Sequence, residues 1–345
     1  MFNQLGVIGC GLMGGSFALA LRRAGLVKRV VGYSKSPSTI ERARKMGIVD
    51  VGAESALLAV SGSDIVLLSV PVAATETTFR AIRHLVEPNV LFMDVGSTKR
   101  DVVDAARRVL RERIGSFVPA HPIAGKEASG IEHADVGLFS GRQVILTPLP
   151  QTNVAMLQKA TDTWAAVGAQ VLKMSPENHD AAFAAVSHLP HMLAFAYFGA
   201  VVNQPAGRDF LSLAGPGFRD FTRIAASNPD IWRDILIANR EEVIKQSSLF
   251  RHALTAFEQA LQTGNAEALE AMIRAPAEGR AAWQMGSMRV PGQGQGPLQA
   301  HSGTAAAGGG PPGGGAASGT MASPGAAAGS GGASGAGSAG GNRQR

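Results

Sequence analysis

"GVIGCGLMGGS", residues 6–16, joins an apolar run to glycines at positions 9, 11 and 14. The apolar residues before the first of these glycines predict a buried strand, and residues 12–25 have the periodicity of a helix. In such a unit Gly9 permits a tight turn, Gly11 lets a phosphate approach the backbone, and Gly14 lets the helix pack against the strand. The stretch therefore predicts the opening strand, turn and helix of a dinucleotide-binding α/β fold.

Short apolar runs alternate with helical patterns through the first half of the chain. The runs are residues 4–9, 29–34, 64–70, 89–94, 116–120, 142–147 and 169–174. They are not strictly alternating, which suits strands buried on both faces, and the helices between them imply right-handed crossovers. We expect a doubly wound parallel sheet, a Rossmann domain, over residues 1–174.

Strand signals stop after Met174. Helical patterns follow over residues 176–202, 217–228, 229–264 and 265–283. At 1.5 Å per residue the third pattern outlasts the diameter of a small domain. We therefore predict an all-α domain over residues 175–290 that pairs with a second copy in a homodimer.

The last segment, residues 291–345, contains no Asp, Glu, Lys, Val, Ile or aromatic residue and is rich in Gly, Ala and Ser. Such a composition buries too little apolar surface to offset its ordering entropy. We predict a disordered tail there.

Composition narrows the classes of partner. The formal net charge is +6, but the basic residues are spread among acidic ones, which argues for small anionic ligands and against a nucleic-acid surface. The single cysteine, Cys10, excludes an internal disulfide and suits a reducing compartment. We see no cleavable signal and no apolar run of the roughly 18 residues that a membrane span needs, so we expect a cytoplasmic protein.

The residues at the end of the second predicted strand bear on the choice between NAD and NADP. An acid expected there in NAD-binding proteins is replaced by Ser34, followed by Lys35 and Ser36. A lysine with two hydroxyls can pair with a 2′-phosphate, which favours NADP over NAD or permits both. Alternatively, Ser36 only caps the helix that begins at Pro37. The remaining predicted cofactor contacts are Leu12, Met13 and Val70, beside the three motif glycines.

Two other strand ends carry polar side chains. "DVGSTK" follows one strand and contains Ser97, whereas "AHPIAGKE" follows another and contains His121. Ser97 or Thr98 could simply cap the next helix. Pro122 confines His121 to extended backbone, and a histidine fixed in this way at the ligand edge of a sheet is a candidate catalytic residue.

Polar residues also interrupt the helical half. His188 and His191 lie three apart on one predicted helix, and Arg219 and Arg223 lie four apart on another. No Cys, Asp or Glu recurs at matching spacing, so we predict no metal site. The histidines could instead be a buried polar pair near the kink expected at Pro190.

In order and separation, "GxGxxG", "DVGSTK", "HPIAGKE", "SHLPH" and "GPGFRDFTRIA" resemble the prephenate/arogenate (cyclohexadienyl) dehydrogenase family of tyrosine biosynthesis, over about residues 4–287. The resemblance implies an oxidative decarboxylation of prephenate to 4-hydroxyphenylpyruvate, or of arogenate to tyrosine, with hydride transfer to NAD(P)+. It implies His121 as hydrogen-bond acceptor or base and Ser97 as its orienting partner. It implies His191 in the substrate site and Arg223 on a substrate carboxylate.

Several charged residues are further candidates for the site. Glu127 and Asp220 are candidate ionic gates beside Arg223, and Lys126 either adds a cation for the substrate or is a surface charge. A β-hydroxyacid-type dehydrogenase would need a lysine from the helical half, where only Lys245 occurs. A nucleotide-sensing module without catalysis is the alternative from another class.

Overall fold

The computed structural model describes residues 1–126 and 128–284. Its main sheet has six parallel strands in the order β3-β2-β1-β4-β5-β6. They are β1 (Phe2–Ile8), β2 (Val27–Tyr33), β3 (Val51–Gly52), β4 (Ile65–Leu68), β5 (Leu91–Asp94) and β6 (Phe117–Val118). The order reverses between β1 and β4, where the carboxyl ends of a doubly wound sheet border the ligand crevice. The predicted sheet is confirmed, although the short β3 was not expected.

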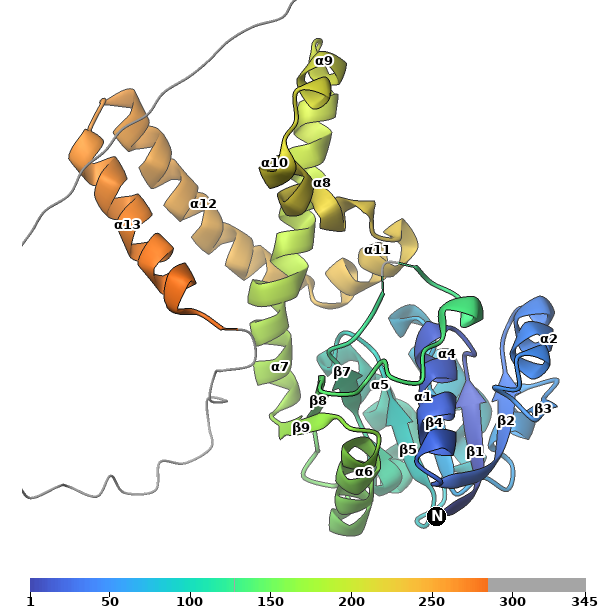
Figure 1. Ribbon diagram of the computed structural model, residues 1–345. Helices are drawn as coiled ribbons and strands as arrows, with labels where there is room; N and C mark the ends of the chain where they lie inside the picture. Colours follow the sequence, from blue (N-terminus) through green and yellow to red (C-terminus); the bar gives the residue numbers. More distant parts are fainter. Residues whose placement is uncertain (127, 285–345) are drawn as a thin grey trace, which may run out of the picture. The chain divides into compact units, whose positions relative to one another are not determined.

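Helices cover both faces of this sheet (Figure 1). Alternate residues of β4 enter two different apolar cores, Ile65 and Leu67 in one and Val66 and Leu68 in the other. Strands buried on both faces account for the continuous apolar runs of the sequence. The helices are α1 (Leu12–Arg23), α2 (Pro37–Lys45), α3 (Ala56–Val60), α4 (Thr75–Ile82), α5 (Arg100–Leu110) and α6 (Val154–Ala166).

A second, three-stranded sheet corrects the expectation of a single strand over 116–120. β6 ends at Val118, Pro119 follows, and β7 (Ala120–Pro122) pairs antiparallel with β8 (Gln143–Leu146), which pairs parallel with β9 (Gln170–Lys173). Proline has no N–H to donate to a ladder, which explains the change of sheet at this point. His121 therefore lies within β7, opposite Ile145, rather than at the end of a parallel strand.

The rest of the described chain is helical. It comprises α7 (Pro176–Phe183), a π-helical turn (Ala184–His188), α8 (Leu189–Val202), α9 (Gly207–Ser212), α10 (Pro216–Thr222), a 3₁₀ turn (Arg223–Ala226), α11 (Pro229–Ala238), α12 (Arg240–Gln262) and α13 (Ala266–Ala282). The single helix predicted over 229–264 is wrong, because the chain breaks between α11 and α12 at Asn239. That residue is buried, and its side chain is hydrogen-bonded to the neighbouring helices.

The helical run Pro176–Val202 is long and apolar enough, by length and composition, to cross a membrane. This corrects the expectation that no apolar stretch is long enough. Three imidazoles lie within it, at His179, His188 and His191. The core helix of a soluble protein can meet the same criteria of length and composition.

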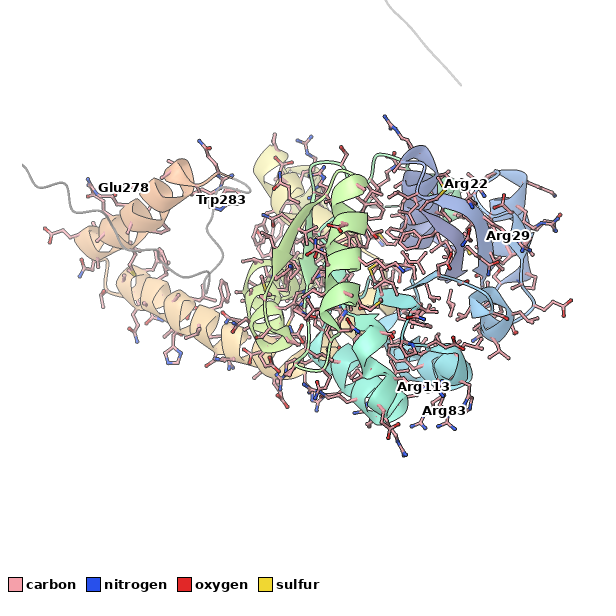
Figure 2. All side chains as sticks on the ribbon, turned by 90° about the horizontal axis from the view of Figure 1, so that it is seen from below. Arg22, Arg29, Arg83, Arg113, Glu278 and Trp283 are labelled. Carbon is pink, nitrogen blue, oxygen red and sulfur yellow. The ribbon has the colours of Figure 1, made fainter. Side chains whose placement is uncertain are left out.

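α12 and α13 lie side by side as an antiparallel hairpin (Figure 1). Large apolar side chains on this hairpin are exposed in the single chain, among them Ile244 at 64% and Leu261 at 65%. Figure 2 shows Glu278 projecting from α13 and Trp283 directly after it, where the Arg280 guanidinium lies 5.0 Å from the Trp283 ring centroid. Residues 285–345, which include the predicted tail, are outside the described residues.

Candidate active site

The glycine turn after β1 has the geometry that a diphosphate needs. Gly9 has a φ of +97°, and a Cβ there would lie 2.1 Å from the Ser69 carbonyl oxygen. A Cβ on Gly14 would lie 2.3 Å from the carbonyl oxygen of Gly9, so helix and turn touch. A Cβ on Gly11 would meet nothing within 4 Å, which leaves the backbone open to a ligand.

The amino end of α1 is free of competing groups. Gly11 occupies the N-cap, no side chain caps the helix, and its first turn contains no acid. The positive end of the helix dipole and its unpaired N–H groups thus face the turn. Cys10 is buried behind this loop, and burial raises the pKa of its thiol to about 12, so it serves as a packed core residue. The residues present fit a bound dinucleotide.

Hydroxyls gather where β2 meets α2. Ser36 is the N-cap residue of α2, but its side chain makes no cap hydrogen bond; its Oγ lies 2.9 Å from Oγ of Ser38. The N–H of Ser36 donates to Oγ of Ser34 at 3.4 Å. The alternative in which Ser36 only caps the helix is therefore wrong. The first turn of α2 carries no acid, and Lys35 is exposed.

A cavity of about 780 Å³ lies beside β7 and between the strand ends and the helices. Four predicted site residues, Ser97, His121, His191 and Arg223, line it together, and so does Lys126. Segments far apart in the sequence supply the rest of its wall, including Ile123, Asp135, Arg142, Phe183, Ser187, His188, Trp232 and Ile235. Glu127 lies outside the described residues.

His121 is joined to a buried dyad that motif analysis did not single out. Its Nδ1 lies 2.8 Å from Nε2 of His179, and Nδ1 of His179 lies 2.7 Å from Oδ1 of Asp180. The Asp180 carboxylate also accepts the backbone N–H groups of Lys99 and Arg100 at 2.8 and 2.9 Å, at the start of α5. Asp180 thus caps α5, and the N-cap position itself is occupied by Lys99 and not by Ser97 or Thr98.

This chain of contacts sets the tautomer of each ring. Because the Asp180 carboxylate only accepts, Nδ1 of His179 carries a proton, and its Nε2 accepts one from Nδ1 of His121 when both rings are neutral. The Nε2 atom of His121 then holds a free lone pair. Burial, together with nearby His179, Lys99 and His188, holds the pKa of His121 well below its ordinary value. Burial also lowers the pKa of His179, so neutral rings are favoured near pH 7.

The carboxyl group of Asp180 remains ionised. Burial raises its pKa, but hydrogen bonds from His179 and from the N–H of Arg100 outweigh that effect and lower it. Phe183 covers the pair of rings, stacked on His179 with centroids 4.5 Å apart and tilted against His121 at 4.8 Å. An ionised carboxylate, two neutral imidazoles and an apolar lid form one ordered unit.

The two later histidines, His188 at the end of the π-helical turn and His191 in α8, have different surroundings. His188 is buried, and its Nδ1 accepts a hydrogen bond from Nδ2 of Asn239 at 3.0 Å. Mainly through burial, the pKa of His188 is lowered to about 4. His191 instead borders the cavity, where Nδ1 donates to the Ser187 carbonyl at 2.9 Å and the ring stacks on Trp232 with centroids 3.5 Å apart. The alternative of a buried polar pair therefore describes His188 and not His191.

The charged candidate residues differ in their partners. Lys126 Nζ lies 3.0 Å from Oδ2 of Asp135 and also donates to the His133 carbonyl at 3.3 Å, so its charge is paired along the cavity wall. Asp220 is paired with Arg219 at 3.2 Å. Arg223 begins the 3₁₀ turn after α10. Burial lowers the pKa of His191, and the charge of Arg223 lowers it further.

Four functional residues were missed by sequence reasoning: His179, Asp180, Phe183 and Asn239. Trp232, in α11, also lines the cavity. A signal existed for part of this set, because positions 179, 183, 187 and 191 recur every four residues and carry His, Phe, Ser and His. Among residues 1–126 and 128–284, no group of three or more potential metal ligands occurs.

A dinucleotide turn, a doubly wound sheet and a cavity lined by histidines and an arginine define the class: a nicotinamide-dependent dehydrogenase with a helical second half. The model of the prephenate dehydrogenase nucleotide-binding domain matches residues 17–173, and that of the prephenate dehydrogenase dimerization domain matches residues 175–275. The chain belongs to the prephenate dehydrogenase family.

Individual members of this family are similar to the chain in sequence and in structure. Prephenate dehydrogenase of Bacillus subtilis is 36% identical over 71% of this chain and 66% of its own length. Cyclohexadienyl dehydrogenase of Zymomonas mobilis is 34% identical over 69% of this chain and 82% of its own. The crystal structure of A. aeolicus prephenate dehydrogenase with hydroxyphenyl propionate and NAD+ matches with a TM-score of 0.76 and 37% identity, covering 81% of this chain and 98% of that one.

Proposed function

We propose that the protein oxidises and decarboxylates prephenate to 4-hydroxyphenylpyruvate, with NAD(P)+ as the hydride acceptor. The observation that carries the proposal is that His121, fixed by the His179–Asp180 dyad, shares one cavity with Arg223 and His191. A base and a cation in one cavity are what a substrate with a hydroxyl at one end and carboxylates at the other requires.

His121 acts on the ring hydroxyl. Its Nε2 accepts the hydroxyl proton, and the positive charge that develops is stabilised through His179 by the Asp180 carboxylate. The bound nicotinamide supplies the hydride acceptor. A positioned general base contributes on the order of 10² to 10⁴ in rate. The resemblance gives Ser97 as the orienting partner of His121, but the hydrogen bond to that ring comes from His179; Ser97 borders the same cavity, where its hydroxyl can instead orient the substrate hydroxyl toward the imidazole.

The other end of the substrate faces Arg223. Its planar guanidinium can hold a carboxylate through two parallel hydrogen bonds, which fixes the ring relative to His121. His191, oriented through Nδ1 by the Ser187 carbonyl, presents Nε2 as a second polar contact. Loss of the ring carboxylate as CO2 restores aromaticity and makes the overall reaction effectively irreversible.

Charge in the cavity favours prephenate over arogenate. The two substrates differ in a keto versus an amino group, and an ammonium needs an acceptor. Among the described residues that line the cavity, Asp135 is the only acid, and its carboxylate is already paired with Lys126 at 3.0 Å. Dual use of both substrates is the alternative, and Glu127, outside the described residues, is the position that bears on it.

We infer that NADP is accepted and slightly preferred over NAD. The support lies in Ser34, Ser36, Ser38 and Lys35 around an α2 amino end that has no acid in its first turn. Hydroxyls, an ammonium and the helix dipole are all complementary to a 2′-phosphate. We also propose that two chains form a homodimer through the helical half, which would cover the exposed apolar side chains of α8, α12 and α13.

A two-by-two assay tests the proposal. Purified protein is mixed with prephenate or arogenate and with NAD+ or NADP+, and absorbance of the reduced nicotinamide is followed. We expect turnover with prephenate and both cofactors, and weak or no turnover with arogenate. Well-folded protein that binds nicotinamide but gives no signal in all four mixtures would instead favour the nucleotide-sensing alternative.

A further inference from the structure

A buried ion pair clamps the backbone of the residue before His121. Lys99 Nζ is bonded to Oδ2 of Asp94 and donates to the Ala120 carbonyl oxygen at 2.8 Å. The other carboxylate oxygen, Oδ1 of Asp94, accepts the N–H of Ala120 at 3.1 Å. Both polar groups of Ala120 are thus held by one pair of side chains, which we call the Lys99–Asp94 clamp.

The clamp lies where three elements meet. Asp94 ends β5, Lys99 precedes α5, and Ala120 begins β7; the side chains of Lys99 and Asp94 are 0% and 4% exposed. The carbonyl that Lys99 holds belongs to the peptide bond that joins Ala120 to His121. Because Pro119 interrupts the sheet just before this point, β7 does not continue the ladder of β6. The clamp replaces that ladder as the link between β5 and β7.

The same short segment also holds the other side of His121. The backbone N–H of Lys99 donates to Asp180 at 2.8 Å, and Asp180 orients His179, which in turn bonds the His121 ring. Lys99 therefore supports His121 twice: its side chain holds the preceding peptide bond, and its backbone N–H holds Asp180, which orients the imidazole through His179. A displacement of this residue would move the base in two ways at once.

We propose that Lys99 and Asp94 are positioning residues for the reaction, which hold His121 at the substrate hydroxyl. This rests on the proposed function of His121 as base. A buried ion pair is weak evidence for stability, since desolvation offsets much of the attraction, so its contribution is to geometry and to the local field. Misplacement of a reacting group by about 1 Å can cost roughly 10²-fold in rate.

The charges of the Lys99–Asp94 clamp affect the protonation of the nearby His121 and His179 rings. The Lys99 ammonium disfavours a protonated ring, and it contributes to the low pKa of both His121 and His179. The other groups that face His121 are His179 and His188, while the Asp180 and Asp94 carboxylates raise the pKa of His179 and so oppose Lys99 there. Loss of the ammonium is expected to raise the pKa of His121 toward its ordinary value.

Two variants of the full-length protein test the proposal. Lys99→Met removes the ammonium, and the double variant Asp94→Asn/Lys99→Met removes the ion pair without leaving a buried unpaired carboxylate. Phe92→Leu, a buried change in the same strand, is the matched control for lost packing. For each protein we would measure thermal unfolding, KM for the cofactor, kcat against pH, and the His121 imidazole titration by NMR, assigned by its loss in His121→Asn.

For both clamp variants we expect kcat to fall by on the order of 10²-fold with the KM for cofactor changed less than about twofold. In Lys99→Met the acid limb of the pH profile and the NMR titration of His121 should both move to higher pH; the double variant should shift less. Phe92→Leu should lose stability without either shift. If Lys99→Met does not fold, the kcat of the double variant tests whether the clamp positions His121.

A folded clamp variant with wild-type kcat and a wild-type His121 titration would overturn the positioning role. The NMR titration does not depend on turnover. An unchanged His121 pKa therefore contradicts this inference alone, whereas a wild-type protein with no activity contradicts the proposed function.

Discussion

His179 stands between His121 and Asp180, and the 2.8 Å contact between its Nε2 and Nδ1 of His121 is the only route in the described residues by which a side chain orients the His121 ring through a hydrogen bond. The direction of that bond follows from the carboxylate at its far end. Because Asp180 accepts from Nδ1 of His179 at 2.7 Å, the lone pair of His121 is left on Nε2. The most direct consequences concern substitutions of the base and of the carboxylate.

His121→Asn removes the base while leaving an amide of similar polarity in the cavity. We expect kcat to fall at least about a hundredfold, because general-base assistance is lost, with little change in cofactor affinity. His84→Asn, which alters an exposed histidine outside the cavity, is the matched control and should behave as wild type. Steady-state kinetics and nicotinamide binding measure both quantities, and unchanged turnover would remove His121 from its role.

Asp180→Asn should reverse the direction of the hydrogen bonds that join residue 180, His179 and His121. An amide NH2 facing Nδ1 of His179 favours the tautomer with a proton on Nε2, which in turn forces a proton onto Nε2 of His121. We expect kcat to drop by about 10² to 10³-fold while substrate KM changes little. Asp162→Asn, at an exposed position on α6, is the control. A mutant with wild-type kcat would show that tautomer selection has no part in the reaction.

The motifs predicted the residues that touch the cavity better than the residues that support them. Ser97, His121, His191 and Arg223 occur in short stretches with recognisable neighbours, and the structure brings all four to one cavity. His179 and Asp180 act through residues about 60 to 80 positions away, a pairing that local sequence does not encode. The one local signal was the recurrence of His179, Phe183, Ser187 and His191 every four residues, and it does not include Asp180.

The predicted boundaries of two elements are wrong because a single residue interrupts a continuous hydrophobic pattern. Pro119 divides an apolar run between two sheets because it has no N–H for the ladder. Asn239 divides a long amphipathic pattern because its side chain donates to the Asp180 carbonyl at 2.8 Å and to His188. In both cases the hydrophobic periodicity was interpreted correctly, and the break depends on contacts made only after folding.

Stability should fall in mildly acidic solution. His188 has an ordinary pKa near 6.5 when unfolded and about 4 when folded, so below pH 6.5 the unfolded state binds protons first. Stability is therefore fully present above about pH 6.5 and is lost as the pH falls toward 4. Between pH 7.5 and pH 5 this one group accounts for about 2 kcal/mol. Denaturant unfolding at both pH values measures it.

His188→Gln tests the assignment, because glutamine can still pair with Asn239 but does not titrate. The loss of stability between pH 7.5 and pH 5 should shrink relative to wild type. His252→Gln, at an exposed position on α12, should leave that loss unchanged. An equal loss in His188→Gln and wild type would assign the acid sensitivity to other groups.

Cofactor preference should respond to the end of β2. Ser34→Asp places a carboxylate beside the expected 2′-phosphate, so the ratio of kcat/KM for NADP+ to that for NAD+ should fall by roughly tenfold or more through charge repulsion. Ser61→Asp, an exposed serine after α3, controls for added charge. An unchanged ratio in Ser34→Asp would refute the interpretation of Ser34, Lys35 and Ser36 as the phosphate contact.

Arg223→Lys separates bidentate binding from simple charge. Lysine keeps the positive charge but loses the planar fork, so a carboxylate held by two parallel hydrogen bonds should bind less tightly. Loss of one hydrogen bond to a charged group, about 1.5 to 3 kcal/mol, corresponds to a roughly 10- to 100-fold rise in substrate KM, with cofactor KM unchanged. Arg219→Lys is the matched control, since Arg219 lies on the preceding helix, is exposed and pairs with Asp220 at 3.2 Å. Equal KM values for Arg223→Lys and wild type would show that any cation at this position suffices, and a rise shared by Arg219→Lys would assign the effect to the local fold instead of to the carboxylate contact.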